Sequence, residues 1–211
     1  MRLTEVCDIS IPVSFGGKQV SAFGGKPACR ETFLDTRKGG SCNCEIYTFS
    51  PHLNGTHTEG VGHITQARIS VPNVGLVEAQ LVTVKPEKGL ISAIKAKPAE
   101  ALIIRTLPNL TTKRTRNYKD WPTFTPDAMR QIVKLGVKHL LVDLPSVDRV
   151  DDAQLTNHRI FWQKGARQKT ITELVYVPTR VKDGKYLLNL QVAAFEADAA
   201  PSRPVLYKVK K

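Results

Sequence analysis

Short apolar runs rich in β-branched residues recur along the chain, and they constrain its fold more than any other feature. Each run is bounded by Pro, Gly or Asp, and segments of this kind are typical of β-strands. We predict strands at 67–71, 76–84, 101–107, 139–144 and 186–195. So many strands in one chain indicate a large sheet.

The last of these runs has the clearest strand periodicity. Asp183-Gly184, just before it, is a dipeptide typical of a hairpin turn. Alternate residues then form one apolar face, as expected of a strand whose side chains point to opposite sides in turn. They are Tyr186, Leu188, Leu190, Val192 and Ala194.

One helix can be predicted together with both of its ends. Thr125 is suited to cap it, Pro126 to occupy its first position and Gly136 to end it. Its buried stripe would consist of Met129, Ile132 and Val133. A second helix is expected at 97–101, and the type of structure at 155–163 is ambiguous.

No feature of the sequence divides the chain. It has 211 residues, enough to bury a substantial core without disulfides or structural metals. Hydrophobic residues make up 41% and charged residues 24%, an ordinary globular composition. There is no internal repeat, low-complexity tract or linker, so we expect a single α/β domain over 1–211.

The N-terminal segment and the cysteines indicate a cytoplasmic protein. The first residues lack the apolar core and the cleavage site of a secretory signal. No segment has the roughly 18 consecutive apolar residues that a membrane span needs. The four cysteines are expected to be reduced, small core residues: Cys7, Cys29, Cys42 and Cys44. Cys42 and Cys44 also fit a metal or redox pair, but no second pair lies at a zinc-like spacing.

The net charge of +12 raises the question of nucleic-acid binding. The basic residues are scattered, however, and the densest run, at 113–119, contains a single aromatic residue. Nucleic-acid surfaces usually combine a basic stripe with stacking aromatics or a recognition helix. We therefore expect a solvated basic surface, and neither nucleic acid nor a membrane as a partner.

A glycine-rich stretch, SPHLNGTHTEGVGHI, holds three of the five histidines. His57 and Glu59 are two residues apart, so on an extended segment their side chains project from the same face. Gly60 and Gly62 allow a sharp turn that can bring His63 back towards them. His52 precedes them in the same stretch. This is a possible ligand set for one metal ion.

Imidazole and carboxylate groups together suit Zn²⁺ or Mn²⁺, with open positions for water in a catalytic site. The alternative is that His52 and His63 are surface residues and that the glycines merely form a turn. The spacing alone leaves both interpretations open, because it matches no widely shared short motif.

Ordered matches along most of the chain support the metal interpretation. The stretch follows the pattern S-P-H-x-G-x-H-x-D-x-P-x-H at Ser50-Pro51-His52, Gly55-Thr56-His57, Glu59 and His63. Further matches, in order, are DIS with Pro12, Asn43, IIRT, VDLPSVD, His158, Glu173 within ITELV, and a terminal hairpin with DGKY. With these pieces the sequence resembles the cyclase family of metal-dependent hydrolases, which includes bacterial kynurenine formamidase and isatin hydrolase.

The resemblance implies both a fold and a set of site residues. The fold is the swivelling β/β/α fold, with a large mixed sheet or barrel-like core and flanking helices. The implied metal ligands are His52, His57, Glu59, His158 and Glu173. His63 is the implied catalytic acid/base, and Phe23 matches an aromatic residue of the substrate pocket. His139 is expected to be structural. Asp143, Ser146 and Asp148 are expected to be structural or to hydrogen-bond the residues that hold the metal.

Three departures from the family pattern concern the site itself. His52 lies three residues before Gly55 where the family has two, which indicates a one-residue insertion and a small bulge at 53–54. Glu59 stands where the family has aspartate. Lys26 replaces an acidic residue near Phe23, where it could attract an anionic substrate or simply be exposed.

The implied activity is hydrolysis of a linear or cyclic amide, such as conversion of N-formylkynurenine to kynurenine and formate. A Zn²⁺ or Mn²⁺ ion would activate water and polarise the carbonyl, while His63 transfers protons. The partners expected are a small-molecule substrate and a second copy of the chain, as a homodimer or homotetramer. The alternative function is a non-catalytic metal- or partner-binding protein with the same fold.

Overall fold

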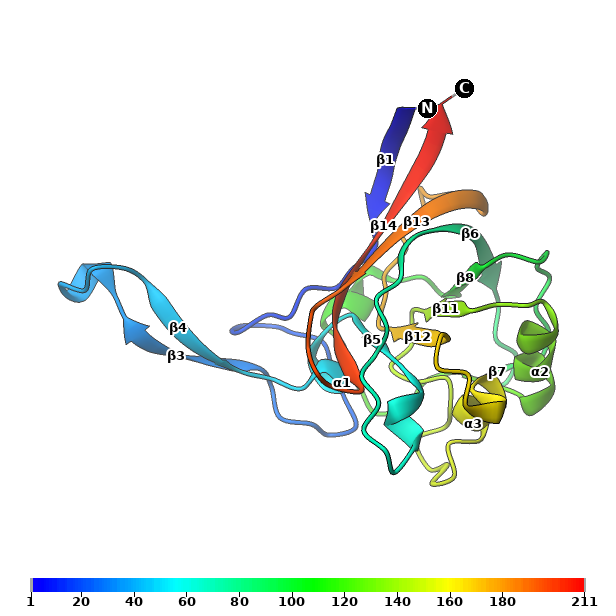
Figure 1. Cartoon of the computed structure of the whole chain (residues 1–211), viewed down its shortest axis with the longest axis horizontal. Helices are drawn as coiled ribbons and strands as arrows, with labels where there is room; N and C mark the ends of the chain where they lie inside the picture. The colour runs from blue at the N-terminus through cyan, green and yellow to red at the C-terminus, as the bar shows by residue number, and fades with distance from the viewer. Residues whose placement is uncertain (1, 211) are drawn as a thin grey trace.

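The computed structural model describes residues 2–210. A mixed β-sheet forms the centre of the fold (Figure 1). It has eight strands in the order β1 (Arg2–Asp8), β14 (Ala199–Lys210), β13 (Gly184–Val192), β6 (Gly75–Val84), β8 (Ala101–Thr106), β11 (His139–Val142), β12 (Thr170–Glu173) and β5 (His57–Glu59). Strand β5 also pairs with the first residues of β14, opposite Ala199 to Pro201. This pairing closes seven of the strands into a barrel-like core and leaves β1 outside the ring.

Four of the five predicted strands are confirmed, as β6, β8, β11 and β13. The prediction at 67–71 is wrong, because this segment forms no strand, and Ile69 within it lies against the turn at Gly62. The predicted hairpin turn at Asp183 is also wrong. Its carboxylate instead accepts hydrogen bonds from Thr83 and Arg105 and thereby joins β6 to β8.

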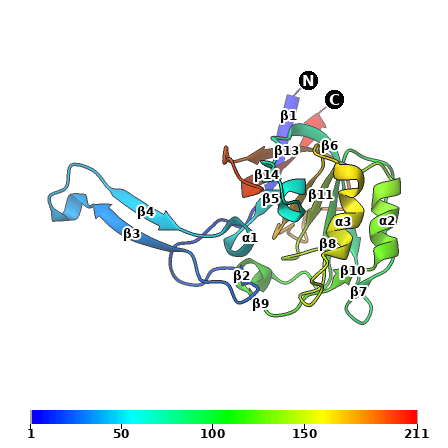
Figure 2. The ribbon, with the colours of Figure 1, turned by 60° about the horizontal axis from the view of Figure 1, so that its bottom comes forward.

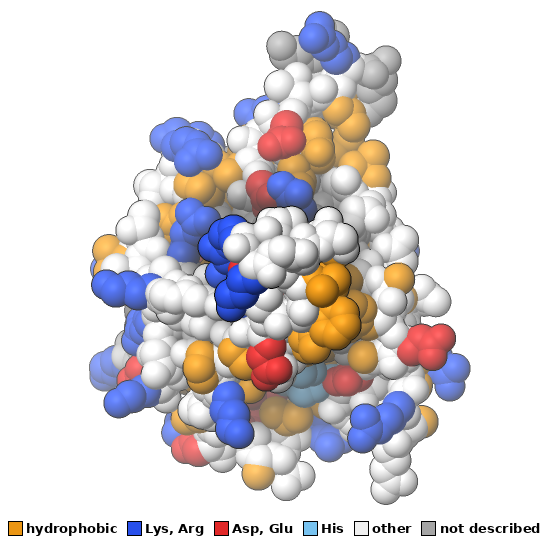
Figure 3. Space-filling model, turned by 90° about the vertical axis from the view of Figure 1, so that its left-hand side faces the viewer, with side chains coloured by type: hydrophobic (Ala, Val, Ile, Leu, Met, Phe, Trp, Pro, Cys, Tyr) orange, Lys and Arg blue, Asp and Glu red, His pale blue; other side chains and the backbone are white. Residues whose placement is uncertain are grey.

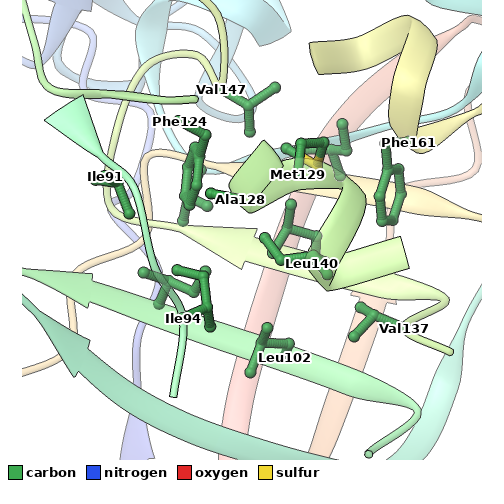
Figure 4. Packing of buried hydrophobic residues seen from close by; sticks show 14 of the residues in the cluster. Ile91, Ile94, Leu102, Phe124, Ala128, Met129, Val137, Leu140, Val147 and Phe161 are labelled. Carbon is green, nitrogen blue, oxygen red and sulfur yellow. The ribbon is translucent and has the colours of Figure 1, made fainter. Parts of the chain in front are cut away.

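The central parallel strands are apolar throughout because both of their faces are buried. Along β8, Ala101 and Ile103 point into the barrel, while Leu102 and Ile104 point outwards. The outward side chains pack against helix α2 (Pro126–Lys134) and helix α3 (Thr156–Phe161), which cover this side of the sheet (Figures 2 and 4). The expected α/β core with flanking helices is confirmed.

Helix α2 begins and ends as the sequence predicts. The Thr125 hydroxyl accepts a hydrogen bond from the backbone N–H of Ala128, and Gly136 follows the helix with a φ of 78°. Met129 and Ile132 are fully buried. The helix expected at 97–101 is wrong, since that segment is irregular and leads directly into β8.

A two-stranded arm projects away from the barrel (Figure 1). It consists of β3 (Cys29–Leu34) and β4 (Cys44–Thr48), connected through the 3-10 turn η1 (Thr36–Lys38). Every residue of β3 is exposed. The prediction of buried cysteines is therefore wrong for Cys29 and Cys44, which lie on the arm, and for the exposed Cys42, whereas Cys7 is buried.

Shorter elements complete the fold: α1 (Pro51–Asn54), η2 (Val61–Ile64), η3 (Thr111–Thr115), η4 (Gln163–Gly165), β2 (Ser21–Ala22), β7 (Leu90–Ile91), β9 (Asn117–Tyr118) and β10 (Thr123–Phe124). Lys113 in η3 departs from the predicted solvated basic surface, because it is buried and pairs with the Asp143 carboxylate at 2.7 Å. Across residues 2–210, we find no helix that combines the length and the apolar character needed to cross a membrane.

Candidate active site

Two paired strands at the closure of the barrel bring the site together. In the antiparallel pair of β5 and β12, His57 lies opposite Glu173. The Nε2 atom of His57 is 3.4 Å from Oε2 of Glu173. Glu59 follows two residues later on the same face of β5, and all three side chains are buried. The strands thus fix one imidazole and two carboxylates at a common point.

Helix α3 supplies a second buried imidazole, that of His158. Its Nε2 atom is 2.9 Å from Oε1 of Glu59 and 3.8 Å from Oε1 of Glu173. Its Nδ1 atom is 2.5 Å from Asp148. The Asp148 carboxylate also accepts hydrogen bonds from the backbone N–H groups of Asn157 and His158. Asp148 therefore orients both the start of α3 and the ring of His158.

Two half-buried histidines complete the cluster. His52 on α1 has its Nδ1 atom 3.2 Å from Oε2 of Glu59, and His63 on η2 has its Nε2 atom 3.6 Å from the same oxygen. The two rings lie 4.4 Å apart, centroid to centroid. Asp198, just before β14, is 3.2 Å from the other nitrogen of each ring.

The glycines of this segment act by close approach and not, as predicted, through unusual backbone dihedrals. Gly55, Gly60 and Gly62 all lie outside the positive-φ region. A Cβ atom on Gly62, however, would lie 2.0 Å from the carbonyl oxygen of Ile69. The turn that returns His63 to the cluster therefore requires glycine at this position.

Burial and mutual contact shift the pKa values of the cluster in opposite directions. Burial lowers the pKa of His57 to about 4, so this ring is neutral at pH 7. Burial also opposes a charge on His158, yet Glu59 and Asp148 raise its pKa to about 10. Burial and the nearby Glu59 carboxylate raise the pKa of Glu173 well above its ordinary value. Burial opposes a charge on Glu59 as well, but contact with His158 and His52 lowers its pKa, so the pKa values of the two glutamates shift in opposite directions.

The pKa values of the two half-buried histidines, His52 and His63, also shift in opposite directions. Burial opposes a charge on His52, but Glu59 raises its pKa to about 9. The pKa of His63 is lowered, since burial and the neighbouring histidines outweigh the attraction of Glu59. His63 is thus neutral near pH 7, as a proton acceptor must be.

The donor set fits a divalent metal ion. The carbonyl of Gly55 can only accept, so Nδ1 of His57 carries the proton and donates across 3.1 Å, and the lone pair of Nε2 faces the centre. This Nε2 atom and Oε2 of Glu59 are buried and make no hydrogen bond. Orphaned buried atoms of this kind are costly unless something binds them, and imidazole with carboxylate suits Zn²⁺, Mn²⁺ or a related cation. Within each of three groups, the ligand atoms lie within 4.8 Å of one another: His52, His57 and Glu59; Glu59, His63 and His158; and His52, His63 and Asp198.

A cavity of about 300 Å³ opens onto this cluster. His63, His158 and Glu173 form part of its wall, and Phe23 and Arg149 line it elsewhere. Phe23 is stacked edge-on against Trp121 at 4.9 Å between ring centroids. Figure 3 shows histidine surface, with acidic surface beside it, directly below a hydrophobic patch.

The structure brings all of the predicted metal-site side chains together. They are His52, His57, Glu59, His63, His158 and Glu173. The bulge expected at 53–54 is instead a single helical turn, α1, which carries His52 towards Glu59. Lys26 is exposed. His139 lies outside the cluster, with its Nδ1 atom 2.9 Å from the Thr170 hydroxyl.

One acidic residue of the cluster, Asp198, was not anticipated from the sequence. It follows a strand within an undistinguished segment, AAFEADAA, and matches no part of the pattern used above. Its position depends on β14 pairing with β5, so that the Gly60 N–H donates to the Asp198 carbonyl. The proximity of Asp198 to the cluster therefore becomes evident only when the pairing of β14 with β5 is known.

The chain is similar to several known proteins. The chain is 28% identical to the kynurenine formamidase of Bacillus cytotoxicus over 98% of its own length and 99% of that protein. It is 26% identical to the kynurenine formamidase of Bordetella avium, over 97% and 98%. Among solved structures, a "predicted metal-dependent hydrolase" from Bacillus stearothermophilus matches with a TM-score of 0.74 at 15% identity, over 98% and 99% of the two chains. Isatin hydrolase A from Labrenzia aggregata matches with a TM-score of 0.69 at 14% identity, over 99% and 94%.

These solved structures share the fold, and the family comparison covers the segment that carries most of the site. The family model described as "Putative cyclase" matches residues 7–149, which include α1, β5 and η2. The chain belongs to the cyclase family.

Proposed function

We propose that this protein is a metal-dependent hydrolase of a linear or cyclic amide, with an arylformamide such as N-formylkynurenine as the leading substrate. The observation that carries the proposal is the convergence of four histidines and two glutamates at one buried point beside a cavity. Its relatives named kynurenine formamidase and isatin hydrolase support the reaction class.

The buried groups would hold the cation, as Zn²⁺ or Mn²⁺. His57, Glu59, His158 and Glu173 offer two imidazoles and two carboxylates, and His52 reaches the same place from α1. When bound, the cation makes water more acidic and polarises an amide carbonyl. A cation at this place would also balance the negative charge of the buried Glu59 and Glu173 carboxylates.

His63 is suited to transfer protons during the reaction. Its ring is half-buried at the wall of the cavity and is neutral near pH 7, so it can take a proton from the attacking water. The same ring can then return the proton to the leaving nitrogen. Phe23 offers an aromatic surface in the same cavity, which suits the aryl group of the substrate.

A substrate panel with metal replacement tests the proposal. Metal-free protein, and the same protein supplied with Zn²⁺ or Mn²⁺, would be assayed on N-formylkynurenine, isatin and simple lactones. We expect metal-dependent turnover of at least one amide, its loss in Glu59→Gln and its retention in the exposed control Glu78→Gln. If the folded, metal-loaded protein turns over none of the substrates in the panel, the non-catalytic alternative is favoured.

We also propose that the arm holds two copies of the chain together as a homodimer, or as a multiple of one. An isolated two-stranded hairpin is marginally stable in water, and this one exposes Phe33 by 67% and Ile46 by 54%. Exposed apolar side chains grouped in this way are typical of interaction surfaces. Light scattering should show a dimer or larger assembly for the natural sequence and a monomer for Phe33→Glu/Ile46→Glu. A monomeric natural protein would refute this part.

A further inference from the structure

Asp198 contacts two functional histidines through a single oxygen atom. Its Oδ2 atom is 3.2 Å from Nε2 of His52 and 3.2 Å from Nδ1 of His63, and both contacts have hydrogen-bond geometry. The opposite nitrogen of each ring faces Oε2 of Glu59. Each imidazole therefore bridges Asp198, at the rim, and Glu59, at the buried centre.

The hydrogen bonds to Asp198 determine which nitrogen of His63 carries its proton. A carboxylate can only accept, so a ring nitrogen bonded to it must be protonated. An imidazole with a single N–H can donate to only one of these two neighbouring carboxylates, Asp198 or Glu59. The contact with Asp198 is a hydrogen bond at 3.2 Å, whereas the contact with Glu59 at 3.6 Å is not. The proton of His63 therefore lies on Nδ1, and the Nε2 lone pair faces the site.

The surroundings of Asp198 suit a residue that orients the histidines better than they suit a metal ligand. Among the side chains of this cluster, the buried atoms left without hydrogen bonds are Nε2 of His57 and Oε2 of Glu59. Asp198, by contrast, is half-buried and already satisfied by two imidazoles. Asp148 stands in the same relation to His158, with its carboxylate behind Nδ1 while Nε2 faces Glu59. Carboxylates behind ligand histidines commonly fix their tautomer and orientation.

We propose that Asp198 is a positioning residue, which orients His52 and His63 together by accepting a hydrogen bond from each on one carboxylate oxygen. The barrel holds it in place, because Gly60 donates to the Asp198 carbonyl and Ala199 pairs with Glu59 across β5 and β14. A ligand histidine and the proton-transferring histidine are thereby coupled to each other. This inference rests on the proposed function for the roles of the two rings but not for the hydrogen bonds themselves.

The test compares Asp198→Asn with Glu196→Gln, which makes the same chemical change at an exposed position two residues away. The first readout needs neither metal nor substrate: the tautomer of His63 in ¹⁵N-histidine-labelled, metal-free protein near pH 7. We expect the Nδ1–H form in the natural protein and in Glu196→Gln. In Asp198→Asn we expect a shift towards Nε2–H, since the charged acceptor is gone.

The second readout is kinetic, with metal at saturation. We expect Asp198→Asn to bind metal in full stoichiometry and to lose about 10- to 100-fold in kcat, with KM changed less than about twofold, because substrate contacts are retained. An unchanged His63 tautomer, an unchanged kcat, or loss of metal at saturation would each overturn the inference, the last by making Asp198 a ligand. If the natural protein hydrolyses nothing on the panel, the proposed function fails, and the tautomer still decides the role of Asp198.

Discussion

Replacement of Asp148 by asparagine should weaken metal binding, and the hydrogen bonds of Asp148 indicate by roughly how much. The Asp148 side chain accepts three hydrogen bonds, from the N–H groups of Asn157 and His158 and from Nδ1 of His158. The single oxygen of an asparagine, placed where Oδ2 lies, can still accept from the N–H and from Nδ1 of His158, whereas the Asn157 N–H, which donates to Oδ1, would face the amide NH2. At the imidazole, what the variant loses is the negative charge of its acceptor.

The magnitude follows from the difference between two kinds of hydrogen bond. A hydrogen bond to a charged group contributes about 1.5–3 kcal/mol and a neutral one about 0.5–1.5 kcal/mol. The loss is therefore about 1–2 kcal/mol, which corresponds to about 5- to 30-fold in the dissociation constant of the metal. Mutation of carboxylates that support ligand histidines has effects of similar size in other metal sites.

Competition with a chromophoric chelator would measure the affinity of Asp148→Asn for Zn²⁺ and Mn²⁺. Asp151→Asn serves as the matched control, because Asp151 is exposed and pairs only with Arg149. Circular dichroism would establish that both variants are folded. If Asp148→Asn is folded and binds metal as tightly as the natural protein, the assignment of His158 as an oriented ligand is incorrect.

Three further predictions concern stability. Leu140→Ala should lower the free energy of unfolding by about 2–5 kcal/mol, because Leu140 is fully buried between the sheet and α2; a loss below about 1 kcal/mol in urea unfolding would contradict this packing. Thr125→Ala should cost about 0.5–2 kcal/mol in the same assay, since it removes the cap on α2, and no loss would mean that the cap is unimportant. Burial lowers the pKa of His139 to about 4; the unfolded state therefore binds more protons between pH 6.5 and 4, and stability falls as the pH falls through that window. Between pH 7.5 and 5, metal-free His139→Gln should lose about 2 kcal/mol less than the natural protein, and equal losses would refute the assignment.

Local patterns in the sequence predict the central elements because these depend on burial that each segment encodes itself. The alternation from Tyr186 to Leu190 and the cap at Thr125 both specify their elements without reference to the rest of the chain. The segment 67–71 has the same apolar character, but it pairs with none of the described strands, and Val71 donates a single backbone hydrogen bond to Ala197. Propensity describes a segment, whereas pairing depends on its neighbours.

Some residues of the candidate site could likewise be anticipated from the sequence, and others could not. His57, Glu59 and His63 lie close together in the sequence, so that a shared metal ion was one of the two interpretations that their spacing left open. His158 and Glu173 could be assigned only through the resemblance to a family. Asp198 was missed because three residues of pairing between β5 and β14 bring it to the cluster, and no local pattern records that contact.

The pairing of β5 with both β12 and β14 determines where this chain can change in length. Because His57 and Glu59 must face the same side, one residue inserted within β5 would turn one of them away from the cluster. The extra residue that the resemblance implies after His52 would lie instead in α1, before the paired strand begins, where the helical turn still brings the imidazole to Glu59. Loops that lead into this strand can thus lengthen during evolution, whereas the strand itself must keep its register.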